Sequence, residues 1–176
     1  MTLDELSLKY DTDKGSSGHW YTPYYERLFG PVRLNVESVL EVGIGSGASL
    51  RMWRDYFPGA MIYGVDMNHI NDLGARTQLY ECEQTDCDRL RSHLQDKKLE
   101  IIVEDASHDQ DKTMQTLDCL WPMLERKGWY VIEDMDLHSF PARIVDWHTQ
   151  HQTEVRELNI LKNKSGGSLI TFIKKQ

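Results

Sequence analysis

The chain has 176 residues, enough for one domain with a sizeable core, and its 40% hydrophobic and 27% charged residues are ordinary for a globular protein. No stretch approaches the roughly 20 apolar residues of a membrane span, and the first residues do not resemble a signal peptide, so we expect a cytoplasmic protein without membrane contacts. The formal net charge of −8 argues against nucleic acid as the main partner, because phosphate binding needs clustered Lys and Arg.

The three cysteines are Cys82, Cys87 and Cys119. An odd number cannot form a closed set of disulfides, and none of them has the CxxC spacing of a zinc site. We therefore expect three reduced thiols, in keeping with a cytoplasmic location.

Residues 1–36 are expected to form an N-terminal cap, with a helix after Pro23 where Tyr24 and Leu28 repeat at helical spacing. Beyond the cap, short apolar runs alternate with amphipathic stretches. The runs predict strands at 38–42, 61–65, 78–82, 100–103, 129–132, 155–161 and 168–173, and the stretches predict helices at 48–57, 87–96 and 111–125.

Alternating strands and helices predict an α/β fold with a doubly wound, mostly parallel sheet of seven strands, in a single domain over 1–176. The last two strands break the alternation, because no helix separates them. They flank residues 162–167, Lys-Asn-Lys-Ser-Gly-Gly, which read as a hairpin turn. We therefore expect the sheet to finish in an antiparallel C-terminal hairpin.

The first strand leads into a glycine-rich loop, Glu41-Val-Gly-Ile-Gly-Ser-Gly-Ala48. Gly43 and Gly45 let the backbone turn sharply and approach a ligand, which the free N–H groups of the next helix then face. Asp66 ends the second strand, where a carboxylate can bind both ribose hydroxyls. The same loop also satisfies the GxGxxA fingerprint of dinucleotide-binding proteins, so both ligand classes stay open here.

Two further acids favour a ligand that carries an amine. Glu41 precedes the first glycine by two residues, where a carboxylate can attract an ammonium group. Asp86 follows the third strand and is placed to meet an adenine amino group.

Carboxylates also end the fourth and fifth strands, which we expect to be neighbours. Glu104-Asp105 and Glu133-Asp134 occupy these ends. Such close carboxylates repel one another unless some are protonated or a cation lies among them, and oxygen ligands without sulfur suit Mg²⁺. We expect Asp105, Glu133 and Asp134 to hold the ion, and Glu104 to point to the other side of its strand. Capping of the following helix is the alternative role for Asp105.

His108 follows Asp105 by three residues, on the loop before the next helix. An imidazole beside a hydroxyl that a metal ion activates is a suitable general base near neutral pH. His108 is therefore the candidate catalytic residue.

Together these motifs resemble those of a class I S-adenosylmethionine-dependent methyltransferase. The D-x-x-H and E-D pairs resemble those of the Mg²⁺-dependent sugar O-methyltransferases of macrolide biosynthesis, of the mycinamicin and tylosin kind. The segment from Asp11 to Glu26, DTDKG…H-x-YT-x-x-YE, is similar to that of the same enzymes and of cephalosporin-hydroxylase-like methyltransferases. Unlike the macrolide enzymes, this chain is expected to have no additional N-terminal domain, which leaves oligomeric state and acceptor open.

The resemblance implies that the chain is an O-methyltransferase with S-adenosylmethionine and Mg²⁺ as cofactors. A sugar or another small hydroxylated natural product, such as a polyketide glycoside, would be the acceptor, and a homodimer is implied at family level. The resemblance assigns the metal to Asp105, Glu133 and Asp134, proton removal to His108, and the methyl donor to Tyr21, Thr22, Glu41, Gly43, Gly45, Asp66 and Asp86. Two alternatives remain: an NAD(P)-dependent oxidoreductase, and a non-catalytic S-adenosylmethionine-binding subunit.

Overall fold

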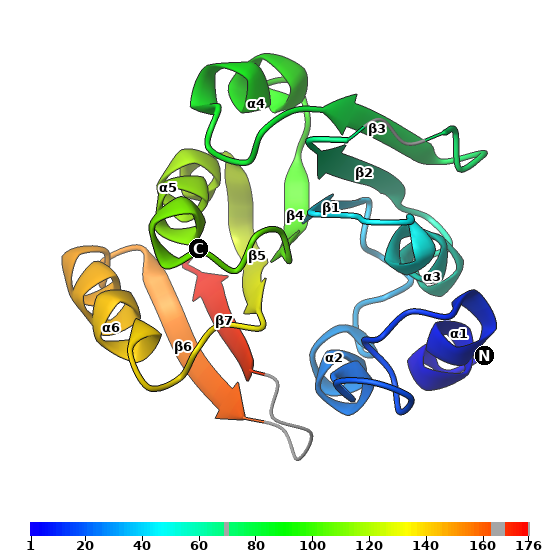
Figure 1. Ribbon diagram of the computed structural model, residues 1–176, viewed down its shortest axis with the longest axis horizontal. Helices are drawn as coiled ribbons and strands as arrows, with labels where there is room; N and C mark the ends of the chain where they lie inside the picture. Colours follow the sequence, from blue (N-terminus) through cyan, green and yellow to red (C-terminus); the bar gives the residue numbers. More distant parts are fainter. Residues whose placement is uncertain (69–70, 163–167, 176) are drawn as a thin grey trace.

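A single seven-stranded sheet forms the centre of the molecule (Figure 1). The structure, a computed structural model, describes residues 1–68, 71–162 and 168–175. The strands are β1 (Ser38–Val42), β2 (Met61–Asp66), β3 (Thr77–Glu81), β4 (Leu99–Glu104), β5 (Leu124–Glu133), β6 (Val155–Lys162) and β7 (Ser168–Lys174). Each overlaps a predicted apolar run, although β5 begins five residues before the run at 129–132.

The strand order is β3-β2-β1-β4-β5-β7-β6, and the first five strands of this order are parallel. Strand β7 lies between β5 and β6 and is antiparallel to both. The predicted α/β class, the seven-stranded sheet and the antiparallel final pair are thus confirmed. The turn predicted at 162–167 falls almost wholly outside the described residues.

Helices cover both faces of the sheet. One face carries α1 (Leu3–Tyr10), α2 (Thr22–Phe29) and α3 (Ala48–Tyr56), and the other carries α4 (Cys87–Leu94), α5 (Gln110–Leu120) and α6 (Phe140–Gln150) (Figure 1). Alternate strand residues enter the two cores: in β1, Val39 packs with the first group of helices and Leu40 with the second. Within the described ranges, no helix is both long and apolar enough to cross a bilayer.

Two helices were not predicted, although each carries a sequence signal. A capping box begins α1, in which Thr2 and Glu5 bond each other's backbone, and Leu3 and Leu6 are buried. Helix α6 buries Phe140, Ile144 and Trp147 at helical spacing.

The helix predicted over 111–125 is shorter than expected. Helix α5 ends at Leu120, a 3₁₀ helix spans Trp121–Met123, and β5 has begun by Leu124. Pro122 explains the early end, because proline lacks the N–H that would continue the helix and also restricts the residue before it.

Candidate active site

The loop between β1 and α3 approaches the residues after β4 so closely that it requires a glycine. Gly43 has a φ of +83°, and a Cβ atom there would overlap the backbone of Asp105 and Ala106. Gly45 also has a positive φ, +47°, but a Cβ atom there would meet nothing within 4 Å. The contact at Gly43 therefore fixes the two loops against each other.

Replacing Gly43 with Ala should destabilise the protein more than replacing Gly45 with Ala. Both variants force a side chain into the left-handed region, which costs about 1–2 kcal/mol. Only Gly43→Ala adds an overlap with backbone, so we expect its total loss to be roughly 3–5 kcal/mol. Urea unfolding of both variants measures the difference, and equal losses would contradict the close approach of the two loops.

Two adjoining cavities lie at the carboxyl ends of the strands. The larger, about 500 Å³, is lined by residues 11–14, the glycine loop, Asp105 and His108. The smaller, about 200 Å³, lies toward β3 and includes Met67 and Gln84 in its wall. Both are lined by Gly43, Asp66 and Ala106, so they meet over the glycine loop. This is the edge where ligands bind in open α/β sheets.

Asp66 lies where the two cavities meet. Its Oδ2 accepts hydrogen bonds from the backbone N–H groups of Ile44 (3.0 Å) and Gly45 (3.2 Å), and its Oδ1 accepts one from Asn68 (2.9 Å). These bonds hold the carboxylate against the glycine loop. A carboxylate fixed in this way suits a pair of neighbouring hydroxyl groups on a ligand that spans both cavities.

Acids from three neighbouring strands converge on one buried lysine. The Nζ atom of Lys14 lies 2.6 Å from Asp105 Oδ2, 2.7 Å from Glu133 Oε2 and 3.2 Å from Glu41 Oε1. The Lys14 side chain is only 1% exposed. Burial alone would lower the pKa of Lys14, but the three carboxylates raise it well above its ordinary value. Lys14 is therefore a permanent cation at the base of the acidic cluster.

Two tyrosines bind further oxygens of the same cluster. The hydroxyl group of Tyr25 donates to Glu133 Oε1, and that of Tyr21 donates to Asp134 Oδ1. Burial and the nearby carboxylates raise the pKa of both phenols, so both remain protonated donors. Both oxygens of Glu133 thus have partners within the protein, whereas the Asp134 side chain stays 13% exposed.

His108 pairs with Asp105 at the wall of the larger cavity. Its Nε2 lies 3.0 Å from Asp105 Oδ1, and this hydrogen bond raises the pKa of His108 above the ordinary value of 6.5. Burial would raise the pKa of Asp105, but Lys14 and His108 outweigh burial and lower it. The backbone of His108 is left-handed, with a φ of +55°, a strained conformation that is typical of functional sites.

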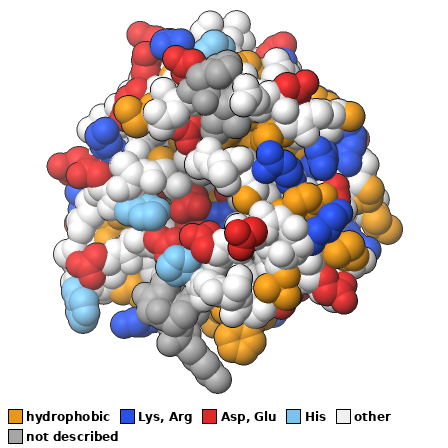
Figure 2. Space-filling view, turned by 45° about the vertical axis from the view of Figure 1, so that its right-hand side comes forward, with side chains coloured by type: hydrophobic (Ala, Val, Ile, Leu, Met, Phe, Trp, Pro, Cys, Tyr) orange, Lys and Arg blue, Asp and Glu red, His pale blue; other side chains and the backbone are white. Residues whose placement is uncertain are grey.

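Asp105, His108 and Asp134 could together bind a metal ion. Each offers one ligand atom, and these atoms lie within 4.8 Å of one another. Acidic and histidine side chains gather near the centre of the face shown in Figure 2. Oxygen ligands with a single imidazole fit a divalent ion that keeps open positions for water or substrate.

Glu104 points to the opposite side of β4, as predicted. It is fully buried and accepts a hydrogen bond from Gln84 Nε2 at 2.9 Å. Burial raises the pKa of Glu104 to about 7. Glu104 thus supports the wall of the smaller cavity through its hydrogen bond with Gln84, which lines that cavity.

The raised pKa of Glu104 predicts a loss of stability with rising pH. The unfolded chain releases this proton near 4.5, the folded chain only near 7, so the unfolding free energy falls between these values and levels off above them. The loss is ~3 kcal/mol. Urea unfolding gives the fall in unfolding free energy between about pH 5 and about pH 8. This fall should be ~2–3 kcal/mol smaller in Glu104→Gln than in the native protein. Equal losses would place the Glu104 pKa near its ordinary value.

A family model described as a methyltransferase domain matches residues 40–135. The chain belongs to this methyltransferase family. It is 37% identical over 151 residues to mycinamicin VI 2''-O-methyltransferase of Micromonospora griseorubida, covering 80% of this chain and 37% of that protein. It is 33% identical over 149 residues to L-olivosyl-oleandolide 3-O-methyltransferase of Streptomyces antibioticus, covering 80% of this chain and 39% of that protein. The methyltransferase chain thus spans about two fifths of the length of these curated relatives.

Solved structures agree with this family. The chain matches the MycE methyltransferase of mycinamycin biosynthesis in complex with Mg and SAH, with a TM-score of 0.87 and 26% identity, over 100% of this chain and 55% of that one. A second MycE complex, with Mg, SAH and mycinamycin VI, gives a TM-score of 0.85 and 27% identity over the same shares of the two chains. The resemblance to macrolide-sugar methyltransferases and the predicted fold are confirmed.

Several predicted donor-binding residues of the methyltransferase lie away from the cavities. Asp86 caps α4 by accepting a hydrogen bond from Arg89 N–H (3.1 Å), and Thr22 Oγ1 donates to Asp4 (2.9 Å). Glu41 is buried behind the glycine loop, where it accepts a hydrogen bond from Ser49. Residues 11–14, rather than Tyr21 and Thr22, line the larger cavity.

Sequence reasoning missed Lys14, Tyr25 and Gln84. Lys14 lies within the Asp-Thr-Asp-Lys-Gly motif, but nothing in the sequence indicates that this lysine is buried under distant strands. Gln84 is the third residue after β3, and its position just beyond a strand end was the available signal.

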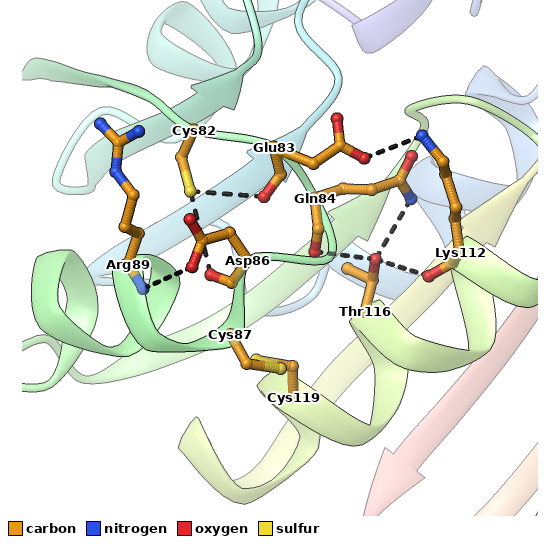
Figure 3. Close-up of a disulfide and its surroundings, with 9 residues drawn as sticks. All are labelled: Cys82, Glu83, Gln84, Asp86, Cys87, Arg89, Lys112, Thr116 and Cys119. Carbon is orange, nitrogen blue, oxygen red and sulfur yellow. Dashed lines mark hydrogen bonds and ion pairs between the residues drawn. A yellow bond between two sulfur atoms is a disulfide. The ribbon is translucent and has the colours of Figure 1, made fainter.

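The expectation of three reduced thiols is wrong. Cys87 and Cys119 form a disulfide that joins α4 to α5, with their Cα atoms 5.6 Å apart, and Cys82 is free and buried (Figure 3). The two residues are separated by 32 positions, so spacing could not reveal the pair. They meet because the start of α4 and the end of α5 pack together on one face of the sheet.

Proposed function

We propose that this methyltransferase transfers a methyl group from S-adenosylmethionine to a hydroxyl group of a sugar or another small natural product, with Mg²⁺ as cofactor. One observation carries the proposal: the Asp105–His108 pair lies in the wall of a cavity that the glycine loop also lines. This arrangement supports a role for His108 as a base beside a site suited to a nucleoside-type donor.

The donor is assigned to the two joined cavities. Asp66 would bind its ribose hydroxyls, the smaller cavity would take the adenine, and the larger would take the methionine portion along Gly43 and Gly45. We propose an indirect role for the remaining predicted residues. Glu41 acts through Lys14, and Asp86 fixes the start of α4 beside the adenine cavity.

Asp105, Glu133 and Asp134 are proposed to hold Mg²⁺. Asp105 and Asp134 each have an oxygen within 4.8 Å of the other, while Glu133 would have to exchange its contact with Tyr25 or Lys14 to join them. When bound, the ion supplies charge that lowers the pKa of the acceptor hydroxyl.

His108 is proposed to act as the general base. Its neutral imidazole takes the hydroxyl proton while the oxygen forms a bond to the methyl carbon and the carbon–sulfur bond breaks, which leaves a methyl ether and S-adenosylhomocysteine. Asp105 orients the ring and stabilises the imidazolium that results. A sugar acceptor is favoured because several relatives are named for methylation of olivosyl or rhamnosyl compounds.

Calorimetry with S-adenosylmethionine and with NAD(P) tests the proposal. We expect heat of binding with the first ligand only, followed by methyl transfer to a deoxysugar glycoside in the presence of Mg²⁺. Binding of NAD(P) alone would favour the oxidoreductase alternative. Donor binding without transfer to any glycoside, with or without Mg²⁺, would favour a non-catalytic subunit.

A further inference from the structure

Lys14 belongs to neither a helix nor a strand, yet it is among the most deeply buried side chains described. It lies between α1 and α2, and its ammonium reaches carboxylates at the ends of β1, β4 and β5. One residue of the N-terminal segment thus connects this segment to three parallel strands.

The backbone of Lys14 fixes the same region. Its carbonyl oxygen accepts hydrogen bonds from the N–H groups of Tyr21 (2.7 Å) and Thr22 (3.2 Å), at the start of α2. Residues 11–14 also line the larger cavity. Side chain and backbone of Lys14 together therefore hold this segment against the cavity.

Carboxylates this close repel one another unless a cation lies among them or some of them are protonated. With Lys14 removed, Glu41, Asp105 and Glu133 would face one another with their shared ammonium gone. Like charges that are buried together repel strongly, and a buried charge that has lost its partner is destabilising. The cluster would then separate or take up protons, and the segment over it would lose its ion pairs with the three strands.

We propose that Lys14 is a positioning residue: its ammonium assembles the carboxylate cluster before any ligand binds, and it fastens residues 11–14 as one wall of the donor cavity. The second half rests on the proposed function, because the larger cavity is assigned there to S-adenosylmethionine. The first half concerns the free protein alone.

Lys14→Met tests both halves. Without metal or donor, hydrogen exchange by mass spectrometry should show peptides over 11–22 exchanging at least about tenfold faster than in the native protein, since their anchoring contact is lost. The dissociation constant for S-adenosylmethionine should rise at least about tenfold, or about 1.4 kcal/mol. Native exchange and native affinity in Lys14→Met would overturn the proposal.

Lys9→Met is the matched control. Lys9 also belongs to the N-terminal segment and pairs with a carboxylate, Asp55 at 2.9 Å, but it is 45% exposed. Exposed pairs contribute little, so exchange and donor affinity should stay native. Equal effects of the two substitutions would show that any lysine lost from this segment has the same consequence, and would refute a special role for Lys14.

The double variant Lys14→Met/Glu133→Gln separates charge compensation from simple packing. Removing one carboxylate charge should raise the melting temperature above that of Lys14→Met, while donor affinity stays low because the attachment is still missing. A double variant no more stable than Lys14→Met overturns charge compensation. Should Lys14→Met fail to fold, the double variant must regain a cooperative unfolding transition. A double variant that also fails to fold would overturn charge compensation. If native protein does not bind the donor, the proposed function fails, whereas the exchange result still decides the first half.

Discussion

His108→Ala is expected to lower kcat by about 10²–10⁴-fold, the usual contribution of a positioned general base. The imidazole would take the proton of the acceptor hydroxyl, and within the described ranges the ring of His108 is the group that pairs with Asp105 Oδ1. Methyl transfer to a glycoside acceptor, followed by chromatography, gives kcat, and calorimetry gives donor affinity in the same preparation.

Donor affinity should change only a few-fold in His108→Ala, because the side chain contributes one part of a large wall. His138→Ala is a suitable control, since His138 belongs to the exposed loop before α6. Retention of full turnover by His108→Ala would remove the histidine from the mechanism.

Asp105→Asn is expected to have an effect at least as large, a loss of about 10³-fold or more in kcat/KM. The reason is that the Asp105 carboxylate pairs with Lys14 and His108 and is also a proposed ligand of Mg²⁺. The substitution keeps the shape but removes the charge that pairs with Lys14 and raises the pKa of His108. It also removes a proposed ligand of Mg²⁺. Activity should lose its dependence on added Mg²⁺ at the same time.

NMR titration of the metal-free protein gives an independent measure of this variant. The pKa of His108 should be lower in Asp105→Asn than in the native protein, because the hydrogen bond that the His108 ring donates to Asp105 is the main cause of its elevation. Asp136→Asn is the control, since Asp136 is an exposed acid that accepts hydrogen bonds from His138 and Ser139. An unchanged His108 pKa in Asp105→Asn would contradict the described pairing.

The sheet was predictable because its strands contain short apolar runs, and because alternation of strands with helices favours parallel pairing. The end of α5 was misplaced because the apolar spacing continues past Leu120, whereas Pro122 stops the helix. The disulfide between Cys87 and Cys119 depends on how two helices pack, which no local pattern encodes.

The acidic strand ends were predictable for a simple geometric reason. Neighbouring parallel strands bring their carboxyl ends to one edge, so Asp105 and Asp134 had to lie close together. The partners of these acids were not predictable. Lys14 and Tyr25 precede the first strand and reach the cluster only through the packing of the N-terminal segment on the sheet.

The central claim is that a divalent ion and the methyl donor bind side by side at the Asp105–His108 edge of the sheet. Mn²⁺, which binds similar oxygen ligands, broadens NMR signals of nearby nuclei. With S-adenosylmethionine labelled with ¹³C at its methyl group and bound to the protein, added Mn²⁺ should broaden the methyl signal strongly, and Asp105→Asn should abolish the effect. A sharp methyl signal in native protein that has bound both Mn²⁺ and the donor would contradict the account.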